Sequence, residues 1–394
     1  MTRANGKVPG VYLQERRAPA APVLPTGVPV FVGLLTDTAP MPVGSASGAD
    51  SYGPAVLFHK TEFLGGARNF LAHAIDGFFD NGGSYCYVIG IKADPKNGIA
   101  TAARLSGALK LTAALLDVDL IAVPDAQALQ GADNNVDETL VCQVQRDMIE
   151  HCNAIGTRVA VLDALRNKTA DALVSDQIGR LNVTAGGPVN AALYHPWVRT
   201  VASDPQFVPP CGQVAGIIAR TDAEIGVFKA PANAIVQDAT DIDAELDADS
   251  LARLNDAGVN CLRAFRARGI RIFGARTLSA DPEWTYLNVR RLVLTLRRWI
   301  ELNMTWVPFE PNVPALWSRI QRELTGYLTT LWRAGALKGD VATDAFFVRC
   351  DADLNPADVR EIGQVVTEIG LAPAVPAEFI VVTVQHRAGT TELT

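Results

Sequence analysis

Apolar residues recur along the chain in two rhythms, one with the period of a helix and one typical of strands. In the segment 61–84 they return at four-residue spacing, at Phe70, Ala74 and Phe78, which predicts an amphipathic helix. Gly82 should help to end this helix, because glycine readily adopts a left-handed backbone. The apolar runs VPVFVGLL before the helix and SYCYVIGI after it predict buried strands.

Strand-like and helix-like segments alternate between Ile91 and Asn260. Apolar runs predict strands in DVDLIAVPD, TRVAVLDA and AALYHPWV, and a helical period runs through ETLVCQVQRDMIEHCNAIG. This alternation is typical of a parallel sheet with helices on its faces. The later stretch VPPCGQVAGIIARTDAEIGVFKAPAN is rich in glycine and proline, so we expect it to be a connection that returns the chain to the first domain.

Two long amphipathic helices are predicted in the last third of the chain, over residues 282–303 and 314–333. Strands are expected in WVPFEPN and AFFVRCD, and a short helix in PADVREIGQVV. The predicted fold class is therefore α/β: an α+β core domain that carries an inserted parallel α/β domain, with extended β arms at both termini. We expect an N-terminal arm, a first core part, the inserted domain, a second core part and a C-terminal arm at residues 1–25, 26–90, 91–258, 259–376 and 377–394.

Each end of the chain holds a strand-like segment without an obvious partner. PGVYLQE begins at Pro9 and PAEFIVVTVQ begins at Pro376, and both contain the β-branched and aromatic residues that suit a pleated sheet. No segment downstream of the second one is expected to form its hairpin partner. An unpaired strand invites another chain to pair with it. The question is therefore where these two segments complete their backbone hydrogen bonds.

The overall charge and the cysteines narrow the classes of function. A net charge of −7 and a pI near 5.3 argue against nucleic acid as the main partner. No apolar run nears the roughly 20 residues that span a bilayer, and the N-terminus lacks the hydrophobic core of a secretion signal, so we expect assembly inside the cell. The six cysteines are scattered without a C-x-x-C pair, which predicts buried free thiols rather than disulfides or zinc ligands.

One set of residues could carry catalysis. Asp125, Asp163 and His195 each stand where a predicted strand ends, and open parallel sheets bind ligands at the carboxyl ends of their strands. Two carboxylates and a histidine could hold a metal ion or perform acid–base hydrolysis. An aspartate after a strand also commonly caps a helix, and we prefer this interpretation because no phosphate loop or nucleophile motif accompanies the three. An α/β hydrolase-like enzyme stays an alternative.

The helix predicted over residues 282–303 carries a double row of arginines. Residues seven apart lie on nearly the same face, which places Arg290 with Arg297 and Arg291 with Arg298. A solvated helix face would explain these rows. A contact with acidic groups of another chain would also explain them, because the arginine fork pairs well with carboxylates.

A series of motifs is similar, in order, to contractile tail sheath proteins. The first are PTGVPVFVGLL and FLGGARNFLAHAIDGFFDNGGSYCYVI, and the series continues with GVFKAPAN, GARTLSADPEWTYLNVRRL, WVPFEPN, LWSRIQREL, AFFVRCD and APAVPAEFIVVTV. The resemblance covers residues 8–90 and 211–386, and the segment between them is more loosely similar. On these motifs the chain is identified as a member of the sheath family, which builds phage tails, R-type bacteriocins, type VI secretion systems and extracellular contractile injection systems.

The resemblance implies a structural protein rather than an enzyme, with no cofactor. Sheath subunits form a helical polymer of stacked rings, hexameric by the resemblance, around an inner tube protein, and they contract from a metastable extended state to drive the tube through a target envelope. Baseplate and terminal cap proteins are further implied partners, whereas nucleic acid and direct membrane insertion are not implied. The particle is expected to assemble in the bacterial cytoplasm and then to be released or to stay in the cell. A self-assembling shell that does not contract is a second alternative.

The resemblance also answers the question of the chain ends. In sheaths, both terminal arms add strands to sheets of neighbouring subunits, and such contacts propagate a helix because they do not close on themselves. The residues implied in these inter-subunit arms are Val11, Tyr12, Leu13, Phe379, Ile380, Val381, Val382 and Val384. The arginine row becomes a candidate contact with the inner tube or a neighbour, through Arg290, Arg291, Arg297 and Arg298.

Overall fold

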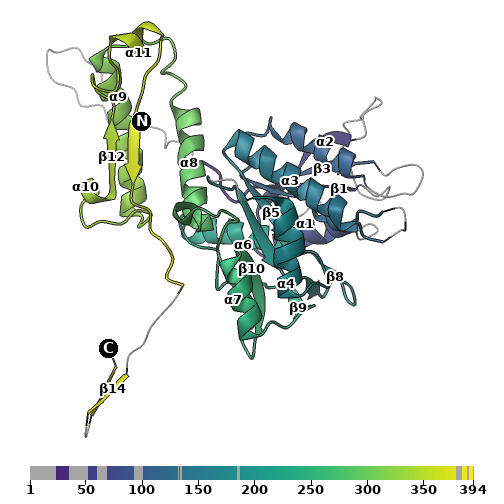
Figure 1. Cartoon of the computed structure of the whole chain (residues 1–394). Coiled ribbons are helices and arrows are strands. Elements are labelled where there is room, and N and C mark those ends of the chain that lie inside the picture. The colour runs from purple at the N-terminus through teal and green to yellow at the C-terminus, as the bar shows by residue number, and fades with distance from the viewer. Residues whose placement is uncertain are drawn as a thin grey trace, which may run out of the picture.

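The computed structural model shows a chain with two parts and a long helix between them (Figure 1). We call the larger part, residues 24–278, the body, and the smaller part, residues 304–378, the lobe. Helix α8, Leu287–Asn303, joins them. The structure describes residues 24–34, 52–59, 69–92, 101–131, 133, 135–183, 187–378, 384–387 and 390–393.

The body is built on one eight-stranded sheet with the order β11-β10-β6-β5-β4-β1-β3-β2. The six strands from β10 to β3 in this order run parallel, and the two edge strands β2 and β11 pair antiparallel to their neighbours. In chain order the strands are β1 Pro29–Leu34, β2 Tyr52–His59, β3 Tyr85–Ile91, β4 Leu120–Ala122, β5 Val159–Asp163, β6 Ala191–His195, β10 Val259–Phe265 and β11 Gly269–Phe273. The α/β fold class predicted from the alternating pattern is confirmed.

Helices cover both faces of this sheet, and side chains alternate between them along each strand. Val30 and Val32 of β1 belong to one buried core, together with residues of α2, Ala102–Thr112, and α3, Glu138–Ile155. Phe31 belongs to the core on the opposite face, where its ring meets that of Phe78 edge-on at 5.9 Å. Phe78 lies in α1, the predicted helix, which runs over Phe70–Asp80. The apolar rhythm of the sequence therefore located these elements correctly.

The glycine- and proline-rich stretch after residue 208 was expected to be a connection, and this prediction is wrong. It forms helix α6, Cys211–Glu224, which packs against α1. A Cβ atom on Gly212 would lie 2.1 Å from the Ala74 carbonyl oxygen, so only glycine permits this approach of the two helices. The glycine that looked like a helix breaker is thus a packing contact in a helix whose first nine residues are all buried.

The shorter elements of the body lie beside and between these layers. A three-stranded antiparallel sheet has the order β8-β7-β9, with β7 at Val198–Thr200, β8 at Phe207–Val208 and β9 at Ala239–Ile242. The remaining helical pieces are η1 Pro124–Ala128, α4 Ala170–Ala172, η2 Leu173–Ile178, α5 Gly179–Leu181 and α7 Ala248–Asp256.

Helix α8 buries side chains against both the body and the lobe. Leu287 and Leu294 belong to a core of the body, whereas Leu292 and Leu296 belong to a core of the lobe. The turn before it is η3, Pro282–Trp284, where the Asp281 side chain accepts from the Glu283 amide. The lobe continues with α9 Pro314–Arg333, α10 Ala342–Ala345, β12 Phe346–Arg349, α11 Ala357–Glu361 and β13 Glu368–Leu371.

Two further expectations concern the segment WVPFEPN and the division into domains. WVPFEPN forms turns rather than a strand, since two prolines remove backbone donors and Phe309 has a φ of 71°. The division into domains stays a prediction. Strands from both sides of the expected boundaries at residues 90/91 and 258/259 are hydrogen-bonded neighbours in one sheet, because β1 pairs with β4 and β6 pairs with β10.

The C-terminal strand-like segment does have a hairpin partner downstream, contrary to expectation. β14, Val384–Arg387, pairs antiparallel with β15, Thr390–Leu393, and Figure 1 shows the hairpin set apart from the body and the lobe. The tail was read as polar, but its adjacent β-branched residues Thr390 and Thr391 suit a strand. The other residues implied in the arms, Val11, Tyr12, Leu13, Phe379, Ile380, Val381 and Val382, lie outside the described residues.

Candidate functional site

Asp125, the first member of the candidate catalytic set, holds the start of helix α1. Its carboxylate accepts hydrogen bonds from the backbone amides of Leu71 at 3.1 Å and Leu34 at 2.6 Å. Burial raises the pKa of Asp125 to about 6, even though these amides act in the opposite direction. The carboxylate therefore ties the end of β1 to a helix N-terminus.

Asp163 has the same role for α6. Its Oδ1 accepts a hydrogen bond of 2.8 Å from the amide of Cys211, the first residue of that helix. Burial raises the pKa of Asp163 to about 7. Helix capping was the preferred interpretation, but the capped helix is not the next one in the sequence, because donor and acceptor lie 48 residues apart.

His195 contributes no partner to either carboxylate. It is buried, with 3% of its surface exposed, and neither ring nitrogen has a hydrogen-bond partner among the described residues. Burial lowers the pKa of His195 to about 4, so its ring is neutral at pH 7. Within the described part of the chain, no group of three or more His, Cys, Asp or Glu side chains is arranged to hold a metal ion.

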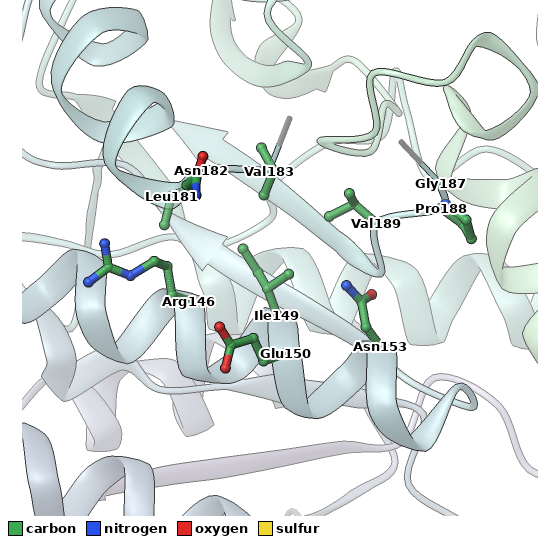
Figure 2. A pocket seen from close by; sticks show the side chains of 10 residues that line it. All are labelled: Arg146, Ile149, Glu150, Asn153, Leu181, Asn182, Val183, Gly187, Pro188 and Val189. Carbon is green, nitrogen blue, oxygen red and sulfur yellow. The ribbon is translucent and has the colours of Figure 1, made fainter. Parts of the chain in front are cut away.

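A cavity of about 350 Å³ opens beside α3 (Figure 2). Its lining mixes apolar and polar side chains from α3 and from the segments on either side of residues 184–186. The lining residues are Arg146, Ile149, Glu150, Asn153, Leu181, Asn182, Val183, Gly187, Pro188 and Val189. Arg146 and Asn153 already bond to the chain itself, through the carbonyl oxygen of Arg180 and the amide of Asn190. None of these ten described residues is a nucleophile, so they contain no nucleophile–base pair.

The arginine row of α8 is divided between the interior and the surface. Arg291 and Arg298 are 2% and 3% exposed, so the expectation that they meet another chain is wrong for these two. Arg298 donates to the backbone oxygen of Asp117 at 2.9 Å. Arg290 is half-buried, while Arg297 is exposed and pairs with Glu301 on the same helix. The periodicity showed two faces, but α8 lies between body and lobe, so its polar face is largely covered too.

Arg291 is the centre of a buried ion cluster. Its guanidinium donates to the carboxylate of Asp222 at 2.8 and 2.6 Å, and to Asp119 at 2.9 Å. The three side chains are 2–6% exposed. Burial alone would lower the pKa of Arg291, but the two carboxylates outweigh it and raise that pKa further above its ordinary value. Arg291 is therefore charged and joins α8 to the sheet and to α6.

The same cluster holds the segment from which the N-terminal arm leaves, which we call the N-root, residues 24–28. Asp119 accepts hydrogen bonds from the amides of Gly27 at 3.0 Å and Val28 at 2.7 Å. Gly27 has a φ of 70°, and a Cβ atom there would lie 2.5 Å from the Ala219 Cα of α6. The N-root is thus fixed from both sides, by buried charge and by close packing.

The last described residues before the C-terminal arm, 372–378, form a second anchored segment, the C-root. The amide of Ala374 donates to Ala336 at 3.0 Å, and Ala372 accepts from Lys338 at 2.7 Å, so the segment lies along the lobe. At its end, Glu378 forms an ion pair with Arg276 of the body at 2.5 Å, and each side chain is 16% exposed. Both chain ends therefore leave from defined points.

The lobe contains a small sheet of two strands. β12 and β13 pair with each other over four residue pairs, and the structure places no third strand beside them in the part of the chain that it describes. The sheet packs against α9, whose Gln321 side chain donates to the Val348 carbonyl oxygen at 3.5 Å. A sheet of two strands still leaves outer backbone groups that a further strand could satisfy.

Two family models together match this chain over residues 98–387. The phage tail sheath protein central domain matches residues 98–278, and the phage tail sheath C-terminal domain matches residues 279–387. The chain belongs to the tail sheath protein family. The family predicted from the collinear motifs is thereby confirmed. Among the described residues of this sheath protein, no helix is both long and apolar enough to cross a bilayer.

Individual relatives agree with the family. A putative prophage major tail sheath protein of Pseudomonas aeruginosa (strain UCBPP-PA14) is 28% identical over 176 residues, 43% of this chain and 44% of that protein. The match thus spans less than half of this curated relative. The anti-feeding prophage helical sheath in its contracted state is 28% identical, with a TM-score of 0.73, over 96% of this chain and 99% of that chain. An extracellular contractile injection system sheath, also contracted, shares the fold at 24% identity, with a TM-score of 0.72, over 96% and 98%.

The side chains that anchor the two roots were not found from the sequence. Arg276 and Glu378 stand 102 residues apart, and Arg291 and Asp119 stand 172 apart. A single sequence carries no signal for pairs at such separations. The one available hint was position, because Glu378 directly precedes the run FIVVTV that predicted the arm.

Proposed function

We propose that this sheath protein is the structural subunit of a contractile injection system. The subunits polymerise helically around an inner tube and contract from a metastable extended arrangement, which drives the tube through a target envelope. The observation that carries the proposal is the likeness over 96% of the chain, at 28% identity, to a helical sheath in its contracted state. It favours a contracting sheath over a shell of fixed shape.

The terminal arms link the subunits in this proposal. Each arm leaves from an anchored root and adds a strand to the small lobe sheet, β12–β13, of a neighbouring subunit. The unpaired edges of that sheet support this step, because strand addition satisfies backbone groups on both sides of the interface. β14 already pairs with β15 along one edge, which leaves its other edge available. A contact of this kind does not close on itself, so it continues into a helix.

The work of contraction comes from the subunits themselves. An extended lattice that is kinetically trapped releases free energy when its subunits repack. A few kcal/mol for each subunit is the ordinary scale of a two-state change, and many coupled subunits add these amounts. No nucleotide is consumed in this scheme, and the subunit acts as a structural element rather than as an enzyme.

The proposed partners follow from the same scheme. They are further copies of this chain in stacked, hexameric rings, an inner tube protein, and baseplate and terminal cap proteins. The particle is phage-tail-like and assembles in the bacterial cytoplasm. Arg297, the exposed member of the arginine row, is the side chain of that row best placed to meet an acidic tube or a neighbour.

Electron microscopy of the purified chain, with and without its tube protein, tests the proposal. The expected result is hollow helical cylinders, with two different diameters among intact particles. Cylinders of a single diameter under all conditions would favour the non-contractile shell. A chain that stays monomeric at every concentration would contradict both.

No observation favours the hydrolase-like alternative. Asp125 and Asp163 each bond to the start of a helix, and His195 is buried and neutral at pH 7. Alanine substitution of all three would abolish an enzyme. A sheath whose chain still folds would keep its assembly.

A further inference from the structure

We propose that Arg276 is a positioning residue for the C-terminal arm: its ion pair with Glu378 sets the point and direction from which the arm leaves its own subunit. This inference rests on the proposed sheath function. It adds a specific side-chain pair that decides which neighbour the arm can reach. The pair joins two residues 102 apart in the sequence and is the last described contact before the arm.

The contact has the geometry of a two-point clamp. Arg276 Nε lies 3.1 Å from Glu378 Oε1, and Arg276 Nη2 lies 2.5 Å from Oε2. Two parallel bonds fix the carboxylate in orientation as well as in distance. Each side chain is only 16% exposed, so water weakens the attraction less than it would at an open surface.

Contacts within the body hold Arg276 in place independently of Glu378. Asn260 in β10 grips its backbone from both sides, accepting from the Arg276 amide at 2.7 Å and donating to its carbonyl oxygen at 2.8 Å. Arg276 Nη1 donates to the carbonyl oxygen of Asn255 at 3.1 Å. The guanidinium is thus preorganised, and its remaining donors point to Glu378.

The C-root is bonded to both the lobe and the body, and the Arg276–Glu378 pair supplies the bond to the body. Residues 372–374 are bonded to the lobe through Ala336 and Lys338, whereas Glu378 is bonded to the body. Without the ion pair, the C-root would keep only its bonds to the lobe and the bond of 3.3 Å from the Asn288 side chain of α8 to the Ala374 carbonyl oxygen. With it, the arm leaves at a fixed position relative to the eight-stranded sheet, and assembly loses less conformational entropy because the strand is presented in advance.

Melting temperature and amide exchange together distinguish a pair that positions the arm from a pair that only stabilises the subunit. If the pair only stabilised the subunit, its removal would lower the melting temperature and leave the C-root as protected as before. If it positions the arm, the subunit should melt within about 2–4 °C of the wild type. The amides of Ala372 and Ala374, which bond to Ala345 and Ala336, should then exchange with solvent about tenfold faster.

The experiment compares Arg276→Gln, Glu378→Gln and the charge swap Arg276→Glu with Glu378→Arg, in the full chain. Arg253→Gln is the matched control, because Arg253 also contacts both oxygens of one carboxylate, that of Asp171, on an exposed part of the body. Hydrogen exchange of the monomer and the yield of sedimentable cylinders are measured for each. We expect both single variants to lose about tenfold or more in cylinder yield, the swap to recover much of it, and the control to match the wild type.

Arg276→Lys tests the fork itself. Lysine keeps the charge but offers one point of attachment instead of two. Cylinder yield should fall between those of the wild type and Arg276→Gln, with the C-root amides partly protected.

Two outcomes would overturn the proposal. One is wild-type exchange and wild-type assembly in both single variants. The other is a charge-swap variant that folds but restores neither the amide protection of the C-root nor the yield of cylinders. If the wild-type chain itself forms no cylinders, the proposed sheath function fails, and the claim that the arm is aimed at a neighbour fails with it. The exchange data would then still show whether Arg276 holds Glu378.

Discussion

The two roots of this sheath protein are anchored by arginines, but in opposite settings. At the N-root, Arg291 and its two carboxylates are 2–6% exposed and lie inside the packing of α8, α6 and the sheet. At the C-root, Arg276 of the body and Glu378 at the end of the C-root are each 16% exposed. A buried charge that loses its partner is costly, whereas a pair near water can open and re-form. The N-root is therefore a fixed point, whereas the C-root is adjustable in the sense that the pair that positions it can open and re-form.

Removing the arms beyond their roots should have the largest effect. Deletion of residues 379–394 spares the Arg276–Glu378 pair, and deletion of residues 1–15 spares the N-root. Either deletion should abolish cylinder formation, because the linking strands are gone, and leave circular dichroism and cooperative unfolding of the subunit intact. Cylinders of normal length from either truncated chain would show that the roots, or other surfaces, suffice for assembly.

Breaking the N-root cluster should be the most damaging single substitution. Arg291→Met removes the charge that bonds to both Asp119 and Asp222, and leaving buried carboxylates uncompensated costs about 3–5 kcal/mol. Urea unfolding of the monomer measures this. A loss below about 1 kcal/mol would mean that the cluster is not the fixed point described here.

The capping carboxylate Asp163 should make stability depend on pH. Its pKa is raised to about 7 in the folded chain from an ordinary value near 3.8, so the protonated form favours folding, and this contribution is lost as pH rises from about 4 through 7. Asp163→Asn keeps an oxygen acceptor for the Cys211 amide and cannot ionise. Between pH 5 and pH 8 the wild type should therefore lose more unfolding free energy than the variant, by on the order of 1–3 kcal/mol. Parallel pH profiles would contradict this.

Breaking the C-root pair should affect stability least. Arg276→Gln should cost about 1 kcal/mol of unfolding free energy, several times less than Arg291→Met. Both are measured by urea unfolding of the monomer under the same conditions. Equal losses at the two arginines would remove the contrast between a fixed and an adjustable root.

The sequence predicted those helices in which apolar residues return at a regular spacing. The helix over 314–333 has this pattern with one face toward water, and α1 has it although eight of its eleven residues are buried. Helix α6 was missed because the glycines and prolines in and around it are typical of a connection, whereas Gly212 serves a helix contact. Periodicity identified the two faces of α8 but could not reveal that body and lobe cover both. Arg291 therefore looked like a surface residue although it is the centre of a buried cluster.

The sequence revealed the family but not the contacts that anchor the two roots. Collinear motifs are local, so a single chain is enough to reveal them, and the sheath assignment followed. The pair of Arg276 with Glu378 depends on a fold that brings together residues 102 apart. Neither residue is unusual in its own surroundings in the sequence. Only the structure could show that the candidate functional contacts lie where the arms begin.

A cryo-electron microscopy reconstruction of assembled cylinders tests the central claim most directly, since it shows where residues 379–387 complete their backbone hydrogen bonds. The account predicts that they lie beside β12–β13 of a neighbouring subunit, with Arg276 and Glu378 still paired within their own chain. Arms that pair within their own subunit, inside a cylinder held together by other surfaces, would contradict it.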